Sequence, residues 1–133
     1  MRFAGYAAVF DRPDNGGDVV RGGAFAGSLA KAREVPLLWQ HRPGAPIGKI
    51  EHLSEDSRGL RVIAALGSGE TARKAEALLA SKKLDGLSFG YRVRESGQKD
   101  GLRELVELEL IEISLVATPM QNQARVHAVE EKY

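Results

Sequence analysis

Cysteine is absent from this 133-residue chain, which excludes disulfide bonds, thiol nucleophiles and metal sites built on thiolates. The sequence has no apolar run of about 18 residues and no signal-peptide pattern, so it offers no candidate membrane-spanning helix. It also lacks an excess of either charge, because 19 Lys and Arg oppose 18 Asp and Glu. The formal net charge of +1 argues against nucleic acid or a membrane surface as the partner.

Nucleotide-binding and metal-binding patterns are absent as well. The chain has no glycine-rich phosphate-binding motif, so a nucleotide is not expected as substrate or cofactor. Its three histidines do not have the spacing of zinc ligands. We therefore expect no cofactor and no metal.

Glycine is the one residue type present in excess, with 15 residues against an average of about 7% in soluble proteins. The glycines are dispersed along the chain, which is typical of tight turns and close backbone contacts rather than of a linker. Hydrophobic residues make up 43% of the sequence, enough for one sizeable core in a single soluble domain.

Short apolar segments separated by turn residues predict a chain of many strands. Strands are expected at residues 3–10, 18–21, 35–41, 47–53, 60–66, 87–94 and 102–117. The best helix is expected at residues 70–83, with Ser68 as its N-cap, and a weaker helical piece at 24–33. A rigid loop is expected at 42–46 and a polar turn at 96–101. This pattern predicts an α+β fold, a small mainly antiparallel β-barrel with surrounding helices.

Strand alternation in residues 86–93 separates an apolar face from a face that carries Ser88 between Gly86 and Gly90. A hydroxyl flanked by two residues without side chains is open to a substrate backbone, and the nearby Arg92 can stabilise negative charge. The alternative is a solvent-facing serine on a strand whose glycines mark a bulge or a barrel corner. Both interpretations stay open from this segment alone.

Three histidines, His41, His52 and His127, are the candidate bases. His41 ends an apolar segment and precedes the expected loop, so it is anchored on one side and exposed on the other. A histidine at the end of a strand is more often a surface or hydrogen-bonded residue than a catalyst. The residue pattern therefore offers His41 as a base without settling its role.

Glu112 stands between two isoleucines and shares a strand face with Ser114. Farther upstream the apolar residues of this strand occupy the even positions, so the buried face changes at about Leu110, as a bulge would cause. Glu112 is either a solvated carboxylate on a strand or a carboxylate directed at a histidine. Ser114, on the same face, is its nearest rival, but a neutral hydroxyl could orient the ring without stabilising its charge.

Several of these segments, taken in order, match the pattern of a known family. They are GYAAVFD (5–11), GDVV (17–20), GAF (23–25), LLWQH (37–41), PIG (46–48), GLSFGY (86–91) and ISLV (113–116), followed by Pro119. Together they resemble the prohead protease family of HK-type tailed phages, also called capsid maturation proteases. Gene transfer agents, which are phage-like particles, carry similar proteases. The resemblance extends over nearly the whole chain.

The resemblance implies a serine endopeptidase with a fold related to herpesvirus assemblin, a small β-barrel surrounded by helices. It implies Ser88 as the nucleophile and His41 as the base, and the acid is placed at Glu112. The acid position varies among relatives, since assemblin uses a second histidine as its third member. The expected oxyanion donors are backbone N–H groups near Gly90, with Arg92 as a candidate helper.

The resemblance also implies where such a protein acts and on what. These enzymes work inside the immature capsid, in the cytoplasm of the bacterial host, where they remove the scaffolding segment from the major capsid protein and commonly digest themselves. The expected partners are therefore the major capsid protein and its scaffolding segment, and a homo-oligomer is left open. Residues 1–126 are assigned to the protease domain and 127–133 to a short C-terminal tail.

Two other functions are kept as alternatives. A non-catalytic β-barrel that serves as a scaffold or interaction module of capsid assembly would lack a close pair of Ser88 and His41. A hydrolase of small molecules would need a deep apolar pocket, for which the sequence has no signature.

Overall fold

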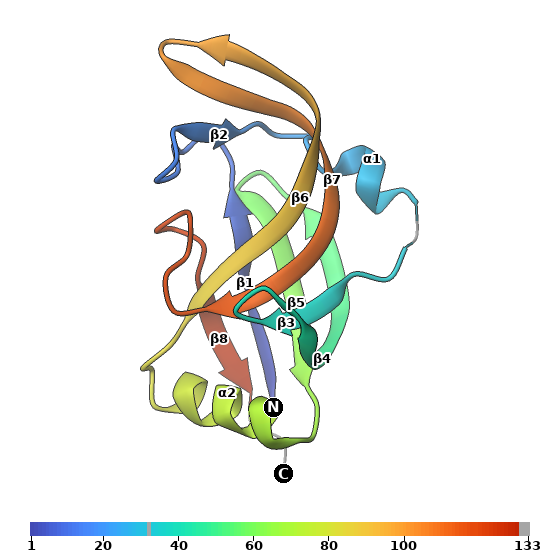
Figure 1. Cartoon of the computed structure of the whole chain (residues 1–133), viewed down its shortest axis with the longest axis vertical. Coiled ribbons are helices and arrows are strands. Elements are labelled where there is room, and N and C mark those ends of the chain that lie inside the picture. The colour runs from blue at the N-terminus through green and yellow to red at the C-terminus, as the bar shows by residue number, and fades with distance from the viewer. Residues whose placement is uncertain (32, 131–133) are drawn as a thin grey trace.

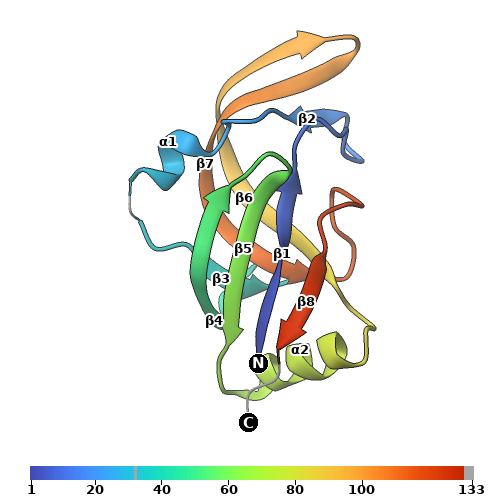
Figure 2. The ribbon, with the colours of Figure 1, turned by 180° about the vertical axis from the view of Figure 1, so that it is seen from behind.

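The computed structural model describes residues 1–31 and 33–130, which form many strands and two short helices (Figure 1, Figure 2). The strands are β1 (Arg2–Val9), β2 (Asp18–Val20), β3 (Pro36–Trp39), β4 (Arg42–Glu55), β5 (Gly59–Leu66), β6 (Gly86–Lys99), β7 (Leu102–Val116) and β8 (Val126–Glu130), and the helices are α1 (Ala26–Leu29) and α2 (Glu70–Ala80). Each of the expected strands overlaps an observed one. The predicted mixture of many strands and few helices is therefore correct.

The strands form an 8-stranded sheet in the order β2-β7-β3-β4-β5-β1-β8, and β6 is also paired with β7. Most neighbours are antiparallel, whereas β2 and β3 run parallel to β7. Because β7 pairs with β6 along one edge and with β2 and β3 along the other, it brings together segments far apart in the sequence.

The expected closed β-barrel is not confirmed, because the sheet does not close on itself. Closure would need a continuous hydrogen-bonded ladder between β6 and β8. Within the described residues the start of β6 meets the residues around the start of β8 at an isolated bridge between Gly86 and Arg125 and at the backbone hydrogen bonds that flank it. Farther along, the distal parts of β6 and β7, residues 95–107, leave the body of the molecule as a two-stranded arm, at the top of Figure 1.

The expected loop at 42–46 is wrong, since β4 already begins at Arg42. Trp39 pairs with Arg42 and Leu38 pairs with Pro46, so residues 43–45 have no partner in β3. An irregularity of this kind tolerates proline, which has no backbone N–H to donate to a ladder. The composition of this proline-rich segment therefore indicates a loop, although the segment lies within a strand.

Both helices are shorter than expected. α1 is a four-residue helix instead of the predicted 24–33, and α2 ends at Ala80. Gly69 is the N-cap of α2 and no side chain caps the helix, so Ser68 does not have the predicted role. The φ of Gly69 is 113°, which a residue with a side chain rarely adopts.

The segment expected to be a C-terminal tail begins inside the sheet. Val126–Glu130 forms β8, which pairs with β1, and residues 131–133 lie outside the described residues. The expected turn at 96–101 is also mostly strand. β6 continues to Lys99, and the chain turns at Asp100 and Gly101.

A bulge at Ile111 explains the change of buried face that the sequence predicts for β7. Gly90 pairs with Glu112 but the next residue of β6 pairs with Leu110, which leaves Ile111 as an extra residue on β7. Leu110 is buried before the bulge and Ile113 after it. The extra residue therefore moves the apolar face of β7 from even to odd positions.

The core consists mainly of strand side chains, and β7 contributes the largest share. The largest fully buried side chains are Phe3, Val19, Phe25, Leu37, Ile47, Leu60, Leu87, Leu105, Leu108, Leu110, Ile113 and Leu115. Full burial of one such side chain stabilises the fold by about 1.5–3 kcal/mol, so β7 is firmly anchored. α2 lies across one end of the sheet (Figure 1). No helix in the described part of the chain is long and apolar enough to cross a membrane.

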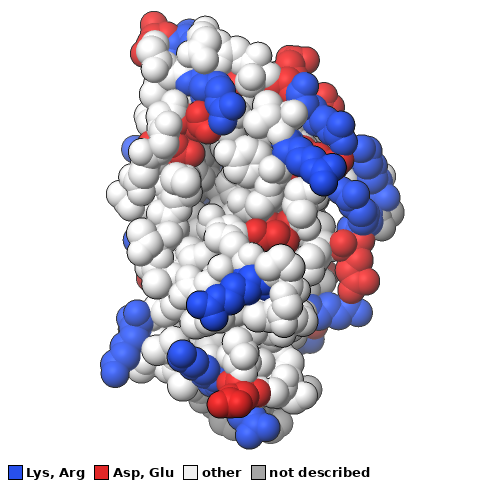
Figure 3. All heavy atoms as spheres, in the orientation of Figure 1, with Lys and Arg blue, Asp and Glu red and all other residues white. Residues whose placement is uncertain are grey.

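Glu109 is a buried carboxylate at the foot of the arm, with a side chain that is 8% exposed. It accepts a hydrogen bond from Arg94 of β6, and Arg33 lies 3.9 Å away on its other oxygen. The hydrogen bond from Arg94, aided by the positive charges of Arg94, Arg33 and Arg92, lowers the pKa of Glu109 although burial opposes the shift. Figure 3 shows basic and acidic side chains gathered together over α1 and beside it.

The Glu109 ion pair should stabilise the fold only while the carboxylate is charged. Because the pKa of Glu109 is lowered on folding from its ordinary 4.5, this stability is complete above that pH and is lost as pH falls through the lower folded value. We expect Glu109→Gln to be less stable than wild type at pH 7, with a gap that narrows on acidification. Urea denaturation at pH 7 and pH 3 measures this, and the exposed Glu107→Gln is the control. A gap independent of pH would contradict the ion-pair explanation.

Candidate active site

Ser88 lies in the middle of the sequence GLSFG (86–90), which has the G-x-S-x-G spacing of the nucleophile elbow in α/β-hydrolases. In those enzymes the serine occupies a sharp turn between a strand and a helix. Here all five residues belong to β6, so the spacing does not indicate that fold. What the glycines provide is room for close neighbours, since a Cβ at Gly86 would come within 2.6 Å of the Val116 carbonyl oxygen and one at Gly90 within 2.6 Å of the Glu112 carboxylate.

The β6–β7 ladder places the candidate polar groups on one face. Ser88 pairs with Ser114 and Gly90 pairs with Glu112. Residues directly opposite each other in antiparallel strands project from the same face. The hydroxyl of Ser88 and the carboxylate of Glu112 therefore rise from the same side of the sheet, and both residues are less than a tenth exposed.

His41 reaches this face from a two-residue turn. Trp39 pairs with Arg42, so Gln40 and His41 alone join β3 to β4, with φ values of 51° and 60°. Such turns favour Asn and Gly, and other residues lose roughly 1–2 kcal/mol each in this left-handed conformation. The strain must be offset by contacts made elsewhere.

Hydrogen bonds to β7 and the segment after it supply those contacts. The backbone N–H of Gln40 donates to the carbonyl of Leu115 at 2.9 Å, and its side-chain oxygen accepts from Ala117 N at 3.1 Å. The backbone N–H of His41 donates to Ser114 Oγ at 3.1 Å. The turn is thus fastened over the end of β7, beside the Ser88–Ser114 pair.

The His41 ring and the Glu112 carboxylate are in contact. Nδ1 of His41 is hydrogen-bonded to Oε1 of Glu112, and Ser114 Oγ donates to Oε2 of Glu112 at 2.7 Å. The His41 side chain is 43% exposed and that of Glu112 is 11% exposed. Since Nδ1 is engaged, Nε2 is the ring nitrogen that remains for a reacting group.

A small cavity of about 110 Å³ is lined by both Ser88 and His41. Its remaining lining residues are Ala7, Asp14, Val20, Leu87, Phe89, Tyr91, Met120 and Gln121. Ser88 and its neighbour Leu87 point to opposite faces of β6, so a cavity that touches both must open at the edge of the strand. Burial, together with the negative charges of Asp18 and Asp14, raises the pKa of Tyr91.

Of the predicted site residues, the structure brings together His41, Glu112 and Ser88. Among the described residues no hydrogen bond joins Ser88 to His41. Gly90 lies beside Glu112, where an added Cβ would come within 2.6 Å of the carboxylate oxygen. Arg92 is exposed, pairs with Glu109 on β7 and does not line the cavity.

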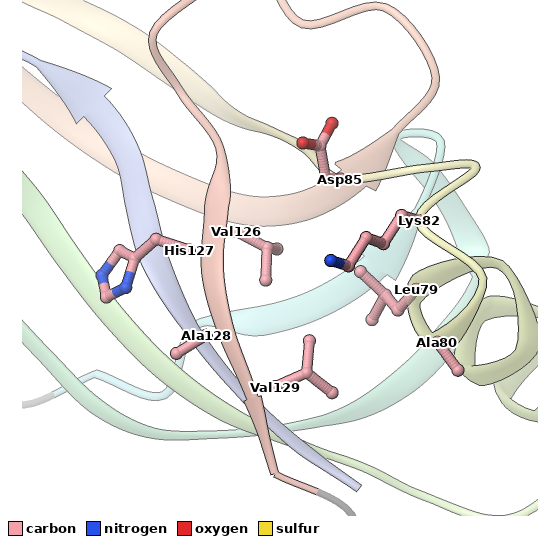
Figure 4. A pocket seen from close by; sticks show the side chains of 8 residues that line it. All are labelled: Leu79, Ala80, Lys82, Asp85, Val126, His127, Ala128 and Val129. Atoms are coloured by element: carbon pink, nitrogen blue, oxygen red, sulfur yellow. The ribbon is translucent and has the colours of Figure 1, made fainter.

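The other two histidines lie elsewhere. His52 is exposed on β4, where Nε2 contacts Ser54 Oγ at 2.9 Å. His127 is exposed on β8 and lines a larger hollow of about 530 Å³ between that strand and α2 (Figure 4). Within the described part of the chain no serine lines that hollow, and its carboxylate, Asp85, is ion-paired with Arg125. The larger hollow therefore lacks the hydroxyl and the histidine–carboxylate contact of the smaller cavity.

Sequence reasoning missed Gln40 at this site, and it considered Ser114 only as a rival of Glu112 for orienting the histidine. The side-chain bond from Gln40 to Ala117 had no signal in the sequence, because it depends on how β3 meets β7. Ser114 did have a signal, since it shares a face with Glu112, but its contact with the His41 backbone did not.

The sequence pattern of caudovirus prohead serine proteases matches residues 1–133. The prohead protease of Enterobacteria phage HK97 is 36% identical over 94 residues, which cover 68% of this chain and 42% of that protein. The chain belongs to the caudovirus prohead serine protease family. It spans less than half the length of the HK97 relative.

Solved structures of herpesvirus proteases share the fold. The protease of Kaposi's sarcoma herpesvirus, in complex with a hexapeptide phosphonate inhibitor, has a TM-score of 0.63 at 14% identity and covers 94% of this chain and 63% of that chain. The varicella-zoster virus protease has a TM-score of 0.56 at 14% identity, with coverage of 94% and 62%. The expected likeness to assemblin is thus confirmed at the level of the fold.

The strained turn predicts an unusual order of stability for substitutions at position 41. His41→Gly and His41→Ala both remove the ring, but only glycine adopts a φ of 60° without penalty. After its larger unfolded-state entropy is subtracted, we expect His41→Gly to be more stable by about 0.5–1 kcal/mol. Urea denaturation measures the difference. At His52, which lies within a strand, the glycine variant should instead be less stable than the alanine variant. The same order of stability at both positions would contradict the explanation by strain.

Gly90 should be required for the position of the Glu112 side chain. In Gly90→Ala the new methyl group would displace the carboxylate, which is the end of a flexible side chain, so the fold should survive with a loss of about 1–3 kcal/mol. The contact between Glu112 and the His41 ring should be lost. Nitrogen-15 NMR of the His41 ring measures this, with Gly97→Ala on the open arm as control. An unchanged Nδ1 signal in Gly90→Ala would show that the carboxylate did not move.

Proposed function

We propose that this chain is a serine endopeptidase of prohead maturation in which Ser88, His41 and Glu112 are the catalytic residues. The observation that carries the proposal is the His41–Glu112 hydrogen bond beside a cavity that His41 shares with Ser88. Membership of the prohead serine protease family supports the same activity.

The proposed mechanism assigns one role to each group. The Ser88 hydroxyl attacks the substrate carbonyl while Nε2 of His41 accepts its proton, and the proton later passes to the leaving amine. Water then hydrolyses the acyl-enzyme by the same route. Glu112 holds the ring through Nδ1 and stabilises the imidazolium form. In an unliganded site the serine–histidine bond is often long and tightens when substrate binds.

The cavity and the strand beside it fit an extended peptide. Within the described part of the chain, residues 88–99 of β6 pair with β7 along one edge and with no strand along the other. A substrate segment that lies along this edge can exchange backbone hydrogen bonds with β6 and bring its scissile carbonyl to Ser88. Backbone N–H groups near Gly90 are the proposed oxyanion donors. The exposed Arg92, opposite Glu109, is the weaker candidate.

The proposed substrates are the scaffolding segment of the major capsid protein and the protease itself, inside the immature capsid in the bacterial cytoplasm. The HK97 relative is called a prohead protease, which supports this setting. A gene transfer agent particle is an equivalent setting. We propose that no cofactor, nucleic acid or membrane takes part.

A non-catalytic scaffold module remains the second candidate, because such a module would need only the fold and no catalytic residues. Against it stands the strained turn that carries His41. Strain of this kind clusters at active sites, and a scaffold would gain nothing from a histidine held there.

The assignment is tested by incubating the protein with a capsid protein that still carries its scaffolding segment. Wild type should cleave it, whereas Ser88→Ala and His41→Ala should lose about 10³-fold or more of the rate. His52→Ala is the matched control and should stay active. Mass spectrometry of the products measures all four proteins. Cleavage by Ser88→Ala would refute the nucleophile, and binding without cleavage by wild type would favour the scaffold module.

A further inference from the structure

Ser114 contacts both partners of the candidate catalytic pair. Its hydroxyl accepts a hydrogen bond from the His41 backbone N–H at 3.1 Å and donates to Oε2 of Glu112 at 2.7 Å. The residue is 0% exposed and does not line the cavity. We propose that Ser114 is a positioning residue that holds the His41 turn and the Glu112 carboxylate in one geometry. The inference rests on the proposed function.

The direction of both bonds follows from elementary chemistry. An ionised carboxylate can only accept and a backbone N–H can only donate, so the hydroxyl must give its proton to Glu112 and accept from His41. A hydroxyl has one donor and two acceptor positions, which allows both bonds at once. An alanine at this position could make neither.

The two oxygens of Glu112 then have separate partners. Oε1 meets the His41 ring and Oε2 meets Ser114, so rotation of the carboxylate would break both hydrogen bonds. The hydrogen bond from the His41 backbone N–H to Ser114 fixes the main chain of the same residue, where φ is strained. Ser114 thus closes a ring of contacts that runs from the backbone of His41 through Ser114 and Glu112 to the imidazole.

This arrangement predicts how activity should change without the hydroxyl. Because Ser114 lies outside the cavity, substrate binding should be little affected. The imidazole, however, would be less well oriented toward Ser88, and small errors of orientation are costly for proton transfer. The loss should therefore fall on kcat and not on KM.

The experiment compares Ser114→Ala with Ser28→Ala. Ser28 is a matched control, because its hydroxyl also accepts a backbone N–H of β7, that of Leu110 at 3.0 Å, yet touches neither His41 nor Glu112. With the capsid protein as substrate, Ser114→Ala should lower kcat about 10–100-fold and change KM less than about twofold. Ser28→Ala should keep the wild-type kcat. Equal losses in both variants would mean that Ser114 has only a structural role.

A double-mutant cycle with Glu112→Gln tests whether Ser114 acts through the carboxylate. If it does, Ser114→Ala should cost little more than about twofold in kcat once Glu112→Gln is present. A full additional loss in the double variant would overturn the inference. Ser114→Thr, which keeps the hydroxyl, should recover part of kcat.

Two further measurements keep the inference testable if the alanine variant does not fold. Ser114→Cys has nearly the same volume but a weak hydrogen-bonding group, so it should fold and still lose kcat. In the wild-type protein the His41 amide should exchange slowly with deuterium although the side chain is exposed, and rapid exchange would count against the bond to Ser114.

Fully active Ser88→Ala and Glu112→Gln enzymes would defeat the proposed function. Inactive Ser88→Ala and Glu112→Gln enzymes, together with a fully active Ser114→Ala enzyme, would defeat this inference alone.

Discussion

The candidate site depends on the pairing of β6 with β7 around the bulge at Ile111. Strict alternation along β7 would carry the apolar face from Leu110 directly to Glu112 and bury the carboxylate in the core. The extra residue reverses the alternation, so that Ile113 takes the core side and Glu112 faces the same way as Ser88. One inserted residue thus places a charged group on the face that carries the serine.

Much of β6 and β7 can be predicted from sequence, because side-chain alternation is a local property. It predicts that Ser88 leaves the apolar face and that the buried face of β7 changes near Leu110, and the structure agrees. The meeting of His41 with Glu112 is different. These residues are 71 positions apart, so no local pattern joins them, and the expectation came from resemblance to a family.

The remaining features depend on contacts between distant segments, which spacing does not encode. Gln40 and His41 are not a usual pair for a two-residue turn, and hydrogen bonds from β7 impose the conformation. The following prolines indicate a loop, yet an irregular ladder accommodates them within β4. Closure of the sheet depends on whether β6 and β8 pair beyond Gly86, and such pairing between distant segments has no signal in local spacing.

The free edge of β6, which can bind an extended peptide, can also promote aggregation. Unpaired backbone groups in a row also attract the same edge of another copy, which is a common start of aggregation. Along residues 92–99 the exposed Val93 is flanked by Arg92 and Arg94, and Glu95 and Lys99 follow. Charges at these positions oppose edge-to-edge association of two folded copies. Near Ser88 the strand carries glycine and aromatic residues instead, so the undefended part of the edge is the part that a flexible chain would enter.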